Sequence, residues 1–404
     1  MGLFDKYDGL TAARRDLETL GIDPFGVEIE RIVSPTEGII HGRHTILAGT
    51  NNYLGLTFNP ECIAAARRAL ETEGTGTTGS RMANGSYSGH RRLEEELAAF
   101  YGMRDAIVFS TGYLANLGML AGLTGPKDVV LLDADCHASI YDGCRLSGAE
   151  VIRFRHNDAA DLAKRMRRLG ARAADALIVI EGIYSMLGDR APLKDIVAVK
   201  REHGGYLLVD EAHSLGVLGE HGRGLAEEQG VLADADFIVG TFSKSLGGTG
   251  GFCVSNLPAL SLVRYSSRPY IFTASPAPST IASTRQALSI LSAGRDLRAR
   301  LRENYLRLHA GLTELGYTLG ASPSPVIAVV LGDRLEALQF WNRLLQRGVY
   351  VNIMLPPATP NGVSLIRCSL SAAHSPAQID AVCAAFADLR SSVGTLAPER
   401  VTEA

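Results

Sequence analysis

The 404-residue sequence contains no apolar run that approaches the roughly 20 residues needed to cross a membrane. Its first residues, MGLFDKYDGL, lack the cationic stretch and apolar core of a secretory leader. Neither sign of charge dominates, with 40 Lys and Arg against 43 Asp and Glu, whereas nucleic-acid binding needs a clustered basic surface. We therefore expect a cytoplasmic protein with no transmembrane segment and no nucleic-acid partner.

Metal and nucleotide motifs are also missing. The six cysteines are scattered, without a CxxC pair or a His/Cys cluster at zinc spacing, so we expect reduced thiols and no metal. The DEAH sequence at 210–213 is typical of some helicases, but no GxxxxGK[ST] loop accompanies it. A GxGxxG match within 74–79 follows a predicted helix rather than a strand, which favours a flexible loop near a ligand or partner over a dinucleotide site.

Short apolar runs dominate the middle of the chain and alternate with amphipathic stretches. Near-continuous apolar strands separated by helices are typical of a parallel sheet buried on both faces. The sequence therefore predicts an α/β fold with a mainly parallel, doubly wound sheet. The runs are AIVF (106–109), DVVLLD (128–133), EVIRF (150–154), ALIVIE (176–181), YLLVD (206–210) and DFIVGT (236–241).

The pattern changes near residue 280 to long amphipathic segments with fewer strands. Helical segments are expected over 279–316, 333–347 and 376–391, and strands over 326–331 and 363–369. This mixture predicts a smaller α+β C-terminal domain. We expect an N-terminal arm at 1–50 with a helix over 4–20, a large domain at 51–285, a small domain at 286–395 and a tail at 396–404.

Polar residues follow several of the predicted strands, where an open parallel sheet binds its ligands. Lys244 comes just after one strand, between two serines and before two glycines. A partly desolvated lysine has a lowered amine pKa and reacts readily with an aldehyde, although a solvated surface lysine is the commoner case. The hydroxyls of Thr241 and Ser243 could bind a phosphate beside it.

Asp210 ends the neighbouring strand and could hold the protonated nitrogen of a pyridine ring, as pyridoxal chemistry requires. His213 could bind the phenolic oxygen of such a ring. An N-cap aspartate beside a solvent histidine would explain this pair equally well. Gly112 and Tyr113 open a predicted helix whose free amides suit a phosphate. His137 follows another strand and could stack on the ring, although a structural role is the usual one for a single histidine.

Taken in order along the chain, these segments resemble the α-oxoamine synthases, a branch of the fold-type I pyridoxal-phosphate (PLP) enzymes. The resemblance extends from about residue 5 to 390. The matching motifs are NNYLGL (51–56), STGYLAN (110–116), DADCHASIYDG (133–143), EGIYSMLGD (181–189), VDEAHSLGVLGEHGRG (209–224), GTFSKSLGGTGG (240–251) and RCSLSAAHS (367–375).

The resemblance implies a role for each matching residue. Lys244 would carry the cofactor as a Schiff base, with Asp210 at the pyridine nitrogen, His213 at the phenolic oxygen and His137 stacked on the ring. The implied cofactor contacts also include Gly112, Tyr113, Ser185, Thr241, Ser243 and Thr273. Of these, Thr273 in RPYIFTAS (268–275) would reach the phosphate of a second subunit in a homodimer with shared active sites. Tyr53, His137 and Arg367 would bind the substrate, with Arg367 paired to its carboxylate.

Within this branch, GTFSKSLGGTGG, FDKYDGL, GTGTTGSR and RPYIFTAS most resemble the members that act on L-serine. The implied reaction joins L-serine to a long-chain acyl thioester, on CoA or acyl carrier protein, and yields 3-oxosphinganine, CO2 and free thiol. This is the first step of sphingolipid synthesis, and contact of the arm with the inner membrane face stays open. Leu355 stands where some bacterial relatives have an arginine assigned to carboxylate binding.

Two alternatives remain open at this stage. The first is a synthase of the same branch that uses glycine or alanine, of the type that forms 2-amino-3-ketobutyrate, 8-amino-7-oxononanoate or 5-aminolevulinate. The second is a non-catalytic partner subunit, although such subunits commonly lose the cofactor lysine, which is retained here at 244.

Overall fold

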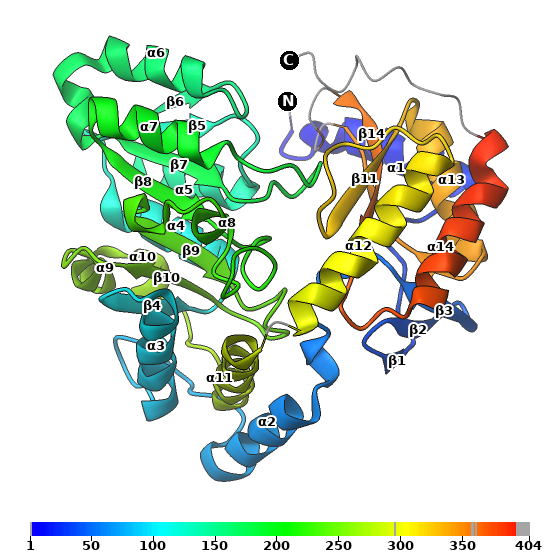
Figure 1. The fold of residues 1–404 in the computed structure, drawn as a ribbon, viewed down its shortest axis with the longest axis horizontal. Helices are drawn as coiled ribbons and strands as arrows, with labels where there is room; N and C mark the ends of the chain where they lie inside the picture. The colour runs from blue at the N-terminus through cyan, green and yellow to red at the C-terminus, as the bar shows by residue number, and fades with distance from the viewer. Residues whose placement is uncertain (1, 295, 357–358, 360–361, 393–404) are drawn as a thin grey trace.

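The computed structural model describes residues 2–294, 296–356, 359 and 362–392. Two bodies lie side by side in Figure 1, a larger one around β4–β10 and a smaller one around β11 and β14. No helix in the described part of the chain has the length and apolar character to span a bilayer. The predicted tail at 396–404 lies outside the described residues.

Among the described residues, the large sheet has seven strands in the order β4-β10-β9-β8-β7-β5-β6. Neighbouring strands are parallel, except that β10 runs antiparallel to β9 and β4. Every predicted apolar run forms one of these strands, so the α/β prediction is confirmed. The strands are β4 (Asp105–Phe109), β5 (Val129–Asp133), β6 (Glu150–Phe154), β7 (Leu177–Glu181), β8 (Tyr206–Asp210), β9 (Phe237–Thr241) and β10 (Gly251–Ser255).

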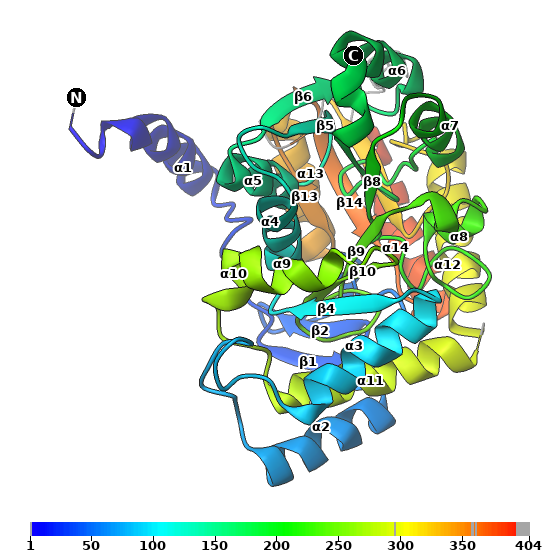
Figure 2. The ribbon, with the colours of Figure 1, turned by 90° about the vertical axis from the view of Figure 1, so that its left-hand side faces the viewer.

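Helices cover both faces of this sheet (Figure 2). Every residue of β5, β7 and β9 is buried, which is why these strands read as unbroken apolar runs. One face packs against α4 (Gly112–Leu123) and α5 (Ala138–Ser147), and the other against α6 (Ala159–Leu169), α7 (Leu193–His203) and α8 (Leu225–Glu228). The β4 edge is covered by α3 (Ser88–Tyr101) and α9 (Leu260–Ser266), and α10 (Arg268–Ile271) packs on α4 and α9.

The C-terminal part begins with two helices where the sequence pattern predicted one continuous segment. α11 (Pro278–Ala293) packs along α2 (Pro60–Glu73) and ends at Gly294, whose backbone is extended; α12 (Asp296–Glu314) then leads into the small body. There β11 (Val326–Leu331), β14 (Ser364–Ser369) and β13 (Asn352–Met354) form an antiparallel sheet. It packs against α13 (Arg334–Gln346) and α12, and α14 (Pro376–Leu389) packs on these two helices.

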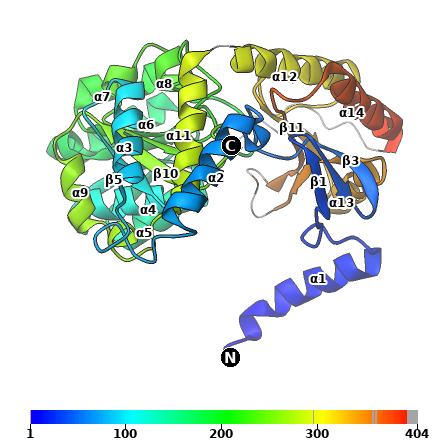
Figure 3. The ribbon, with the colours of Figure 1, turned by 90° about the horizontal axis from the view of Figure 1, so that it is seen from below.

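The N-terminal segment contains strands that the sequence reading did not predict. β1 (Arg31–Ser34), β2 (Glu37–Ile40) and β3 (Arg43–Leu47) form a meander, and β3 also pairs in parallel with β12 (Val349–Tyr350) of the small body. The predicted helix over 4–20 forms as a 3₁₀ turn (Asp5–Tyr7) followed by α1 (Asp8–Leu20). Figures 2 and 3 show α1 extending away from the rest of the chain. Further 3₁₀ turns span Leu56–Phe58, Gly170–Asp175, Leu232–Asp234 and Arg390–Ser392.

Candidate active site

A cavity of about 280 Å³ lies at the carboxyl ends of the parallel strands. Tyr53, Ser185, Thr273 and Arg367 are not part of its lining, although Tyr53 contacts a lining residue. The strand-end turns therefore converge as the sequence predicted. The predicted site residues that line the cavity are Gly112, Tyr113, His137, Asp210, His213, Thr241, Ser243 and Lys244.

Lys244 lies in the turn after β9, which the buried Phe242 anchors in the core. The Lys244 carbonyl accepts a bond from the Gly247 amide at 3.0 Å, and the Phe242 carbonyl accepts one from Gly248 at 2.9 Å. Burial lowers the pKa of the Lys244 amine to about 8, although the carboxylates of Asp210 and Glu181 oppose this shift. At pH 7 roughly one-tenth of the amine is therefore neutral and nucleophilic, far more than for an ordinary lysine.

Asp210 is the last residue of β8, and its carboxylate is buried. Its two oxygens accept hydrogen bonds from the Asn116 side-chain amide at 2.7 Å and from the Ala212 backbone amide at 2.9 Å. Both donors are neutral, so neither balances the negative charge of the carboxylate. A buried carboxylate in such a setting is well suited to a cationic ligand group, such as the protonated nitrogen of PLP.

His213 is buried beside this strand end, and its Nδ1 lies 2.6 Å from the Tyr53 hydroxyl. Burial holds the pKa of His213 well below its ordinary value, and the cationic side chains of Lys244 and Arg367 lower it further. The imidazole is therefore neutral. The structure thus places Tyr53, predicted as a substrate contact, directly against His213.

A phosphate cradle is formed where α4 begins. Gly112 is its first residue, and a Cβ built there would lie 2.8 Å from both Cβ and Oγ1 of Thr241. The Thr241 hydroxyl in turn lies 2.8 Å from that of Ser243. The glycine brings the free backbone amides at the start of α4 close to these two hydroxyls. Such a set of hydrogen-bond donors fits the phosphate of PLP.

His137 caps the start of α5, with Nδ1 2.8 Å from the Ser139 hydroxyl. Its backbone amide donates to the carboxylate of Glu181, the buried last residue of β7. Burial lowers the pKa of the His137 imidazole, against an opposing effect from Asp210. The ring is therefore held at the cavity wall in its uncharged form.

Arg367 enters from β14 of the small body and is buried. Its guanidinium donates to the Ser185 carbonyl at 3.0 Å and to the Asn51 side-chain oxygen at 2.7 Å, while Nε is buried without a hydrogen-bond partner. Among the described residues no carboxylate forms an ion pair with it. An unpaired buried guanidinium of this kind is suited to a substrate carboxylate. Leu355 follows β13 and packs against the apolar core.

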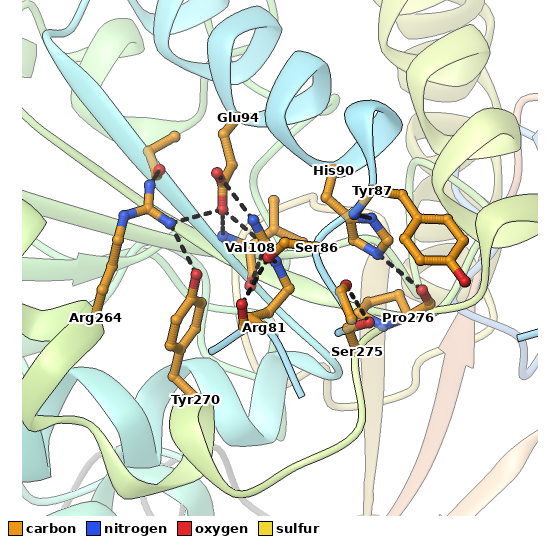
Figure 4. Close-up of polar contacts among 12 residues, drawn as sticks. Arg81, Ser86, Tyr87, His90, Glu94, Val108, Arg264, Tyr270, Ser275 and Pro276 are labelled. Carbon is orange, nitrogen blue, oxygen red and sulfur yellow. Dashed lines mark hydrogen bonds and ion pairs between the residues drawn. The ribbon is translucent and has the colours of Figure 1, made fainter. Parts of the chain in front are cut away.

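Thr273 lies outside the cavity, on a segment fixed by the polar network of Figure 4. The Ser275 amide donates to the Gly79 carbonyl at 3.0 Å, and His90 Nε2 lies 2.9 Å from the Pro276 carbonyl. The same network holds Glu94 between Arg81 at 2.9 Å and Arg264 at 3.0 Å. The glycine-rich loop at 74–79 and the segment carrying Thr273 therefore form one unit at the molecular surface.

The sequence reading did not single out two polar residues of the cavity wall, Asn116 and Glu181. Asn116 lies four residues after Gly112 and so on the same helical face, a spacing that could have identified it. Glu181 ends an apolar strand just as Asp210 does, so the same argument applied to β7 would have included it.

Comparisons with known proteins agree with this geometry. Residues 43–386 match the aminotransferase class I and II family. A serine palmitoyltransferase of Caulobacter vibrioides is 57% identical over 98% of both chains. The structure of Sphingomonas wittichii serine palmitoyltransferase superimposes with a TM-score of 0.94 at 52% identity, covering 97% of this chain and 99% of that one.

A third relative carries the cofactor. The serine palmitoyltransferase of S. paucimobilis, solved with a bound PLP–myriocin aldimine, superimposes with a TM-score of 0.95 at 50% identity over 97% of this chain and 99% of that one. The residues of the cavity described above fit PLP, and the predicted resemblance is confirmed. The chain belongs to the aminotransferase class I and II family of PLP enzymes, within its serine palmitoyltransferase group.

Proposed function

We propose that this chain catalyses the PLP-dependent condensation of L-serine with a long-chain acyl thioester, giving 3-oxosphinganine, CO2 and free thiol. The observation that carries the proposal is the cavity in which the Lys244 amine, with a pKa of about 8, shares one wall with the buried Asp210 carboxylate and the cradle at Gly112. The 57% identity with a serine palmitoyltransferase over nearly the whole chain supports the choice of substrates.

Each residue has a defined task toward the cofactor. Lys244 Nζ would hold its aldehyde carbon, Asp210 would keep a proton on the pyridine nitrogen, and neutral His213 would bind the phenolic oxygen. The Gly112 amide and the hydroxyls of Thr241 and Ser243 would hold the phosphate. When bound, PLP withdraws electrons from the substrate carbon beside the amino group.

The remaining residues act on the substrate. Arg367 would bind the serine carboxylate, and His137 would orient the carboxylate or the thioester carbonyl from the cavity wall. When it is not bonded to the cofactor, the Lys244 amine would remove the proton from the α-carbon of serine and later return one. We further propose a cytoplasmic homodimer in which Thr273 of each subunit contacts the phosphate held by the other.

The test combines product analysis with a cofactor spectrum. Purified protein should be yellow, should trap cofactor on Lys244 with borohydride, and should convert labelled serine and palmitoyl-CoA to 3-oxosphinganine. Lys244→Ala should abolish the borohydride-trapped adduct and product formation, and it should change the visible absorbance of the bound cofactor. A saturable spectral response to glycine but not to serine would instead identify a different synthase, and colourless protein unaffected by Lys244→Ala would identify a partner subunit.

A further inference from the structure

A second buried cluster of acid and base groups lies behind His137, and the proposed mechanism does not use it. His156, just after β6, has Nδ1 2.8 Å from Asp133 Oδ1 and Nε2 2.7 Å from Asp189 Oδ2. The Asp133 side chain is fully buried, and those of His156 and Asp189 are about 20% exposed, at 21% and 19%. One imidazole therefore joins two carboxylates from separate turns.

The geometry requires a doubly protonated ring, because both nitrogens point to carboxylate oxygens and each must donate. Burial alone would lower the pKa of His156, but the hydrogen bonds and charges of Asp133 and Asp189 raise it to about 10. The other groups that face the ring are the Asp135 carboxylate at 4.0 Å and the edge-on ring of Tyr184 at 4.4 Å. The imidazolium is therefore the stable form at neutral pH.

Each aspartate belongs to a turn that carries a site residue. Asp133 ends β5 and accepts the Asp135 amide at 2.9 Å, which shapes the turn leading to His137. Asp189 closes the turn after β7, where its carbonyl accepts the Tyr184 amide at 2.9 Å. That turn includes Ser185, whose carbonyl accepts the hydrogen bond from Arg367.

The turn after β7 is also a junction between the two bodies. Leu187 packs against Ala328, Val330 and Leu365 of the small sheet. A Cβ built on Gly188 would lie 2.1 Å from the Val326 carbonyl oxygen, so the turn and β11 are in close contact. The turn thus contacts the small sheet directly, and through the Ser185 carbonyl it also holds the Arg367 guanidinium of β14.

We propose that His156 is a positioning residue that fixes the turns bearing His137 and Ser185 relative to each other and so sets the place of Arg367 for the amino-acid carboxylate. This inference rests on the proposed function, because it concerns binding of the amino-acid substrate. It predicts that His156 governs affinity for serine far more than affinity for PLP, since the phosphate cradle and Lys244 lie on other elements.

The test uses the PLP-loaded enzyme and the variant His156→Gln, which keeps a polar side chain but loses the charge. We expect the KM for serine, and its dissociation constant measured by calorimetry without an acyl donor, to rise roughly tenfold to a hundredfold, as for a misplaced binding group. PLP content should stay within about twofold of the wild type, because Lys244 and the phosphate cradle at Gly112, Thr241 and Ser243 lie on other elements. His221→Gln is the matched control, because His221 also pairs with a carboxylate, Glu227, at 2.6 Å, but on the surface.

Asp189→Asn provides a second variant should His156→Gln fail to fold. If His156 and Asp189 act through the same contact, their effects should not add. The double variant should then bind serine about as weakly as whichever single variant binds it more weakly. Unchanged serine affinity in folded, PLP-loaded variants would overturn the inference and leave the proposed function standing. A wild-type enzyme that does not bind serine would instead overturn the proposed function.

Discussion

At the residue scale, the Lys244 amine should set the pH dependence of cofactor capture. Its pKa is lowered by burial to about 8, and only the neutral amine attacks an aldehyde. The rate at which apoenzyme develops the absorbance of bound PLP should therefore rise as the pH increases through about 8 and then level off. Stopped-flow mixing from pH 6 to 10 measures this profile, and a rise that continues as for an ordinary lysine would contradict it.

Asp210 offers a second test at the same scale. Asp210→Asn preserves the size of the side chain but removes the charge that would keep a proton on the pyridine nitrogen. We expect the condensation rate to fall by roughly 10²–10³-fold, the effect of losing one well-placed electrostatic group. Asp195→Asn, at an exposed site in α7, should leave the rate unchanged. Equal rates for the two variants would remove Asp210 from the proposed chemistry.

The sequence predicted residues such as Asp210 and Lys244 because each lies at or just after the end of an apolar strand. His156 could not be found in this way, since a lone histidine in a polar turn is usually structural. Its significance depends on Asp133 and Asp189, which are distant in sequence and meet only because β5 pairs with both β6 and β7.

At the scale of elements, the start of α4 should tolerate no side chain at its first position. In Gly112→Ala the added Cβ would meet Thr241 at 2.8 Å, so α4 or β9 would have to shift. Overpacking of about 1–3 kcal/mol should weaken PLP binding roughly tenfold to a hundredfold, as measured by cofactor titration. Gly9→Ala is the control, because its Cβ would have no neighbour within 4 Å.

The contact between α3 and its surroundings depends on the buried Glu94, which pairs with Arg81 and Arg264. Glu94→Ala leaves Arg81 without its carboxylate and Arg264 with only the more distant Asp105 at 3.5 Å, and we expect the free energy of unfolding to fall by about 3–5 kcal/mol. Urea denaturation measures the change. The adjacent Glu95→Ala removes only an exposed pair with Arg91 and should cost about 0.5 kcal/mol or less. Similar losses for both variants would show that burial of the Glu94 pair adds nothing.

Helices and strands were predicted well where the apolar pattern is strong, and poorly where the pattern covers only a few residues. Five of the six parallel strands read clearly because nearly all of their residues are buried, whereas the edge strand β6, which is mostly exposed, was found from its β-branched residues in EVIRF. β10, with the sequence GFCVS, was missed because it directly follows a glycine-rich turn. It pairs antiparallel with β9, so no crossover helix separates the two strands in the sequence. The division of 279–316 into two helices depends on Gly294, a single residue within an otherwise continuous pattern.

At the scale of the whole molecule, the exposed apolar side chains near Thr273 favour association of two copies. Leu262, Tyr265 and Phe272 are at least 65% exposed, at 65%, 71% and 71%, although all are large and apolar. Exposed apolar surface of this kind marks an interface in many soluble proteins. We therefore expect sedimentation to give the mass of a dimer.

Mixed dimers test the shared site directly. Thr273→Ala and Lys244→Ala homodimers should both be impaired, but random mixing should restore about a quarter of the wild-type activity, because half of the dimers then carry one intact site. If Thr273 serves its own subunit, no site is repaired and mixing restores nothing.

The pairing of β3 with β12 also affects how the chain folds during its synthesis on the ribosome. Residues 43–47 leave the ribosome some 300 positions before Val349, the strand residue that pairs with Ile46. Until then the outer edge of β3 has open backbone groups, and domains with such distant pairing fold slowly. Nascent chains arrested before residue 349 should therefore be cut by proteases within the first 50 residues, and those extended past β14 should resist.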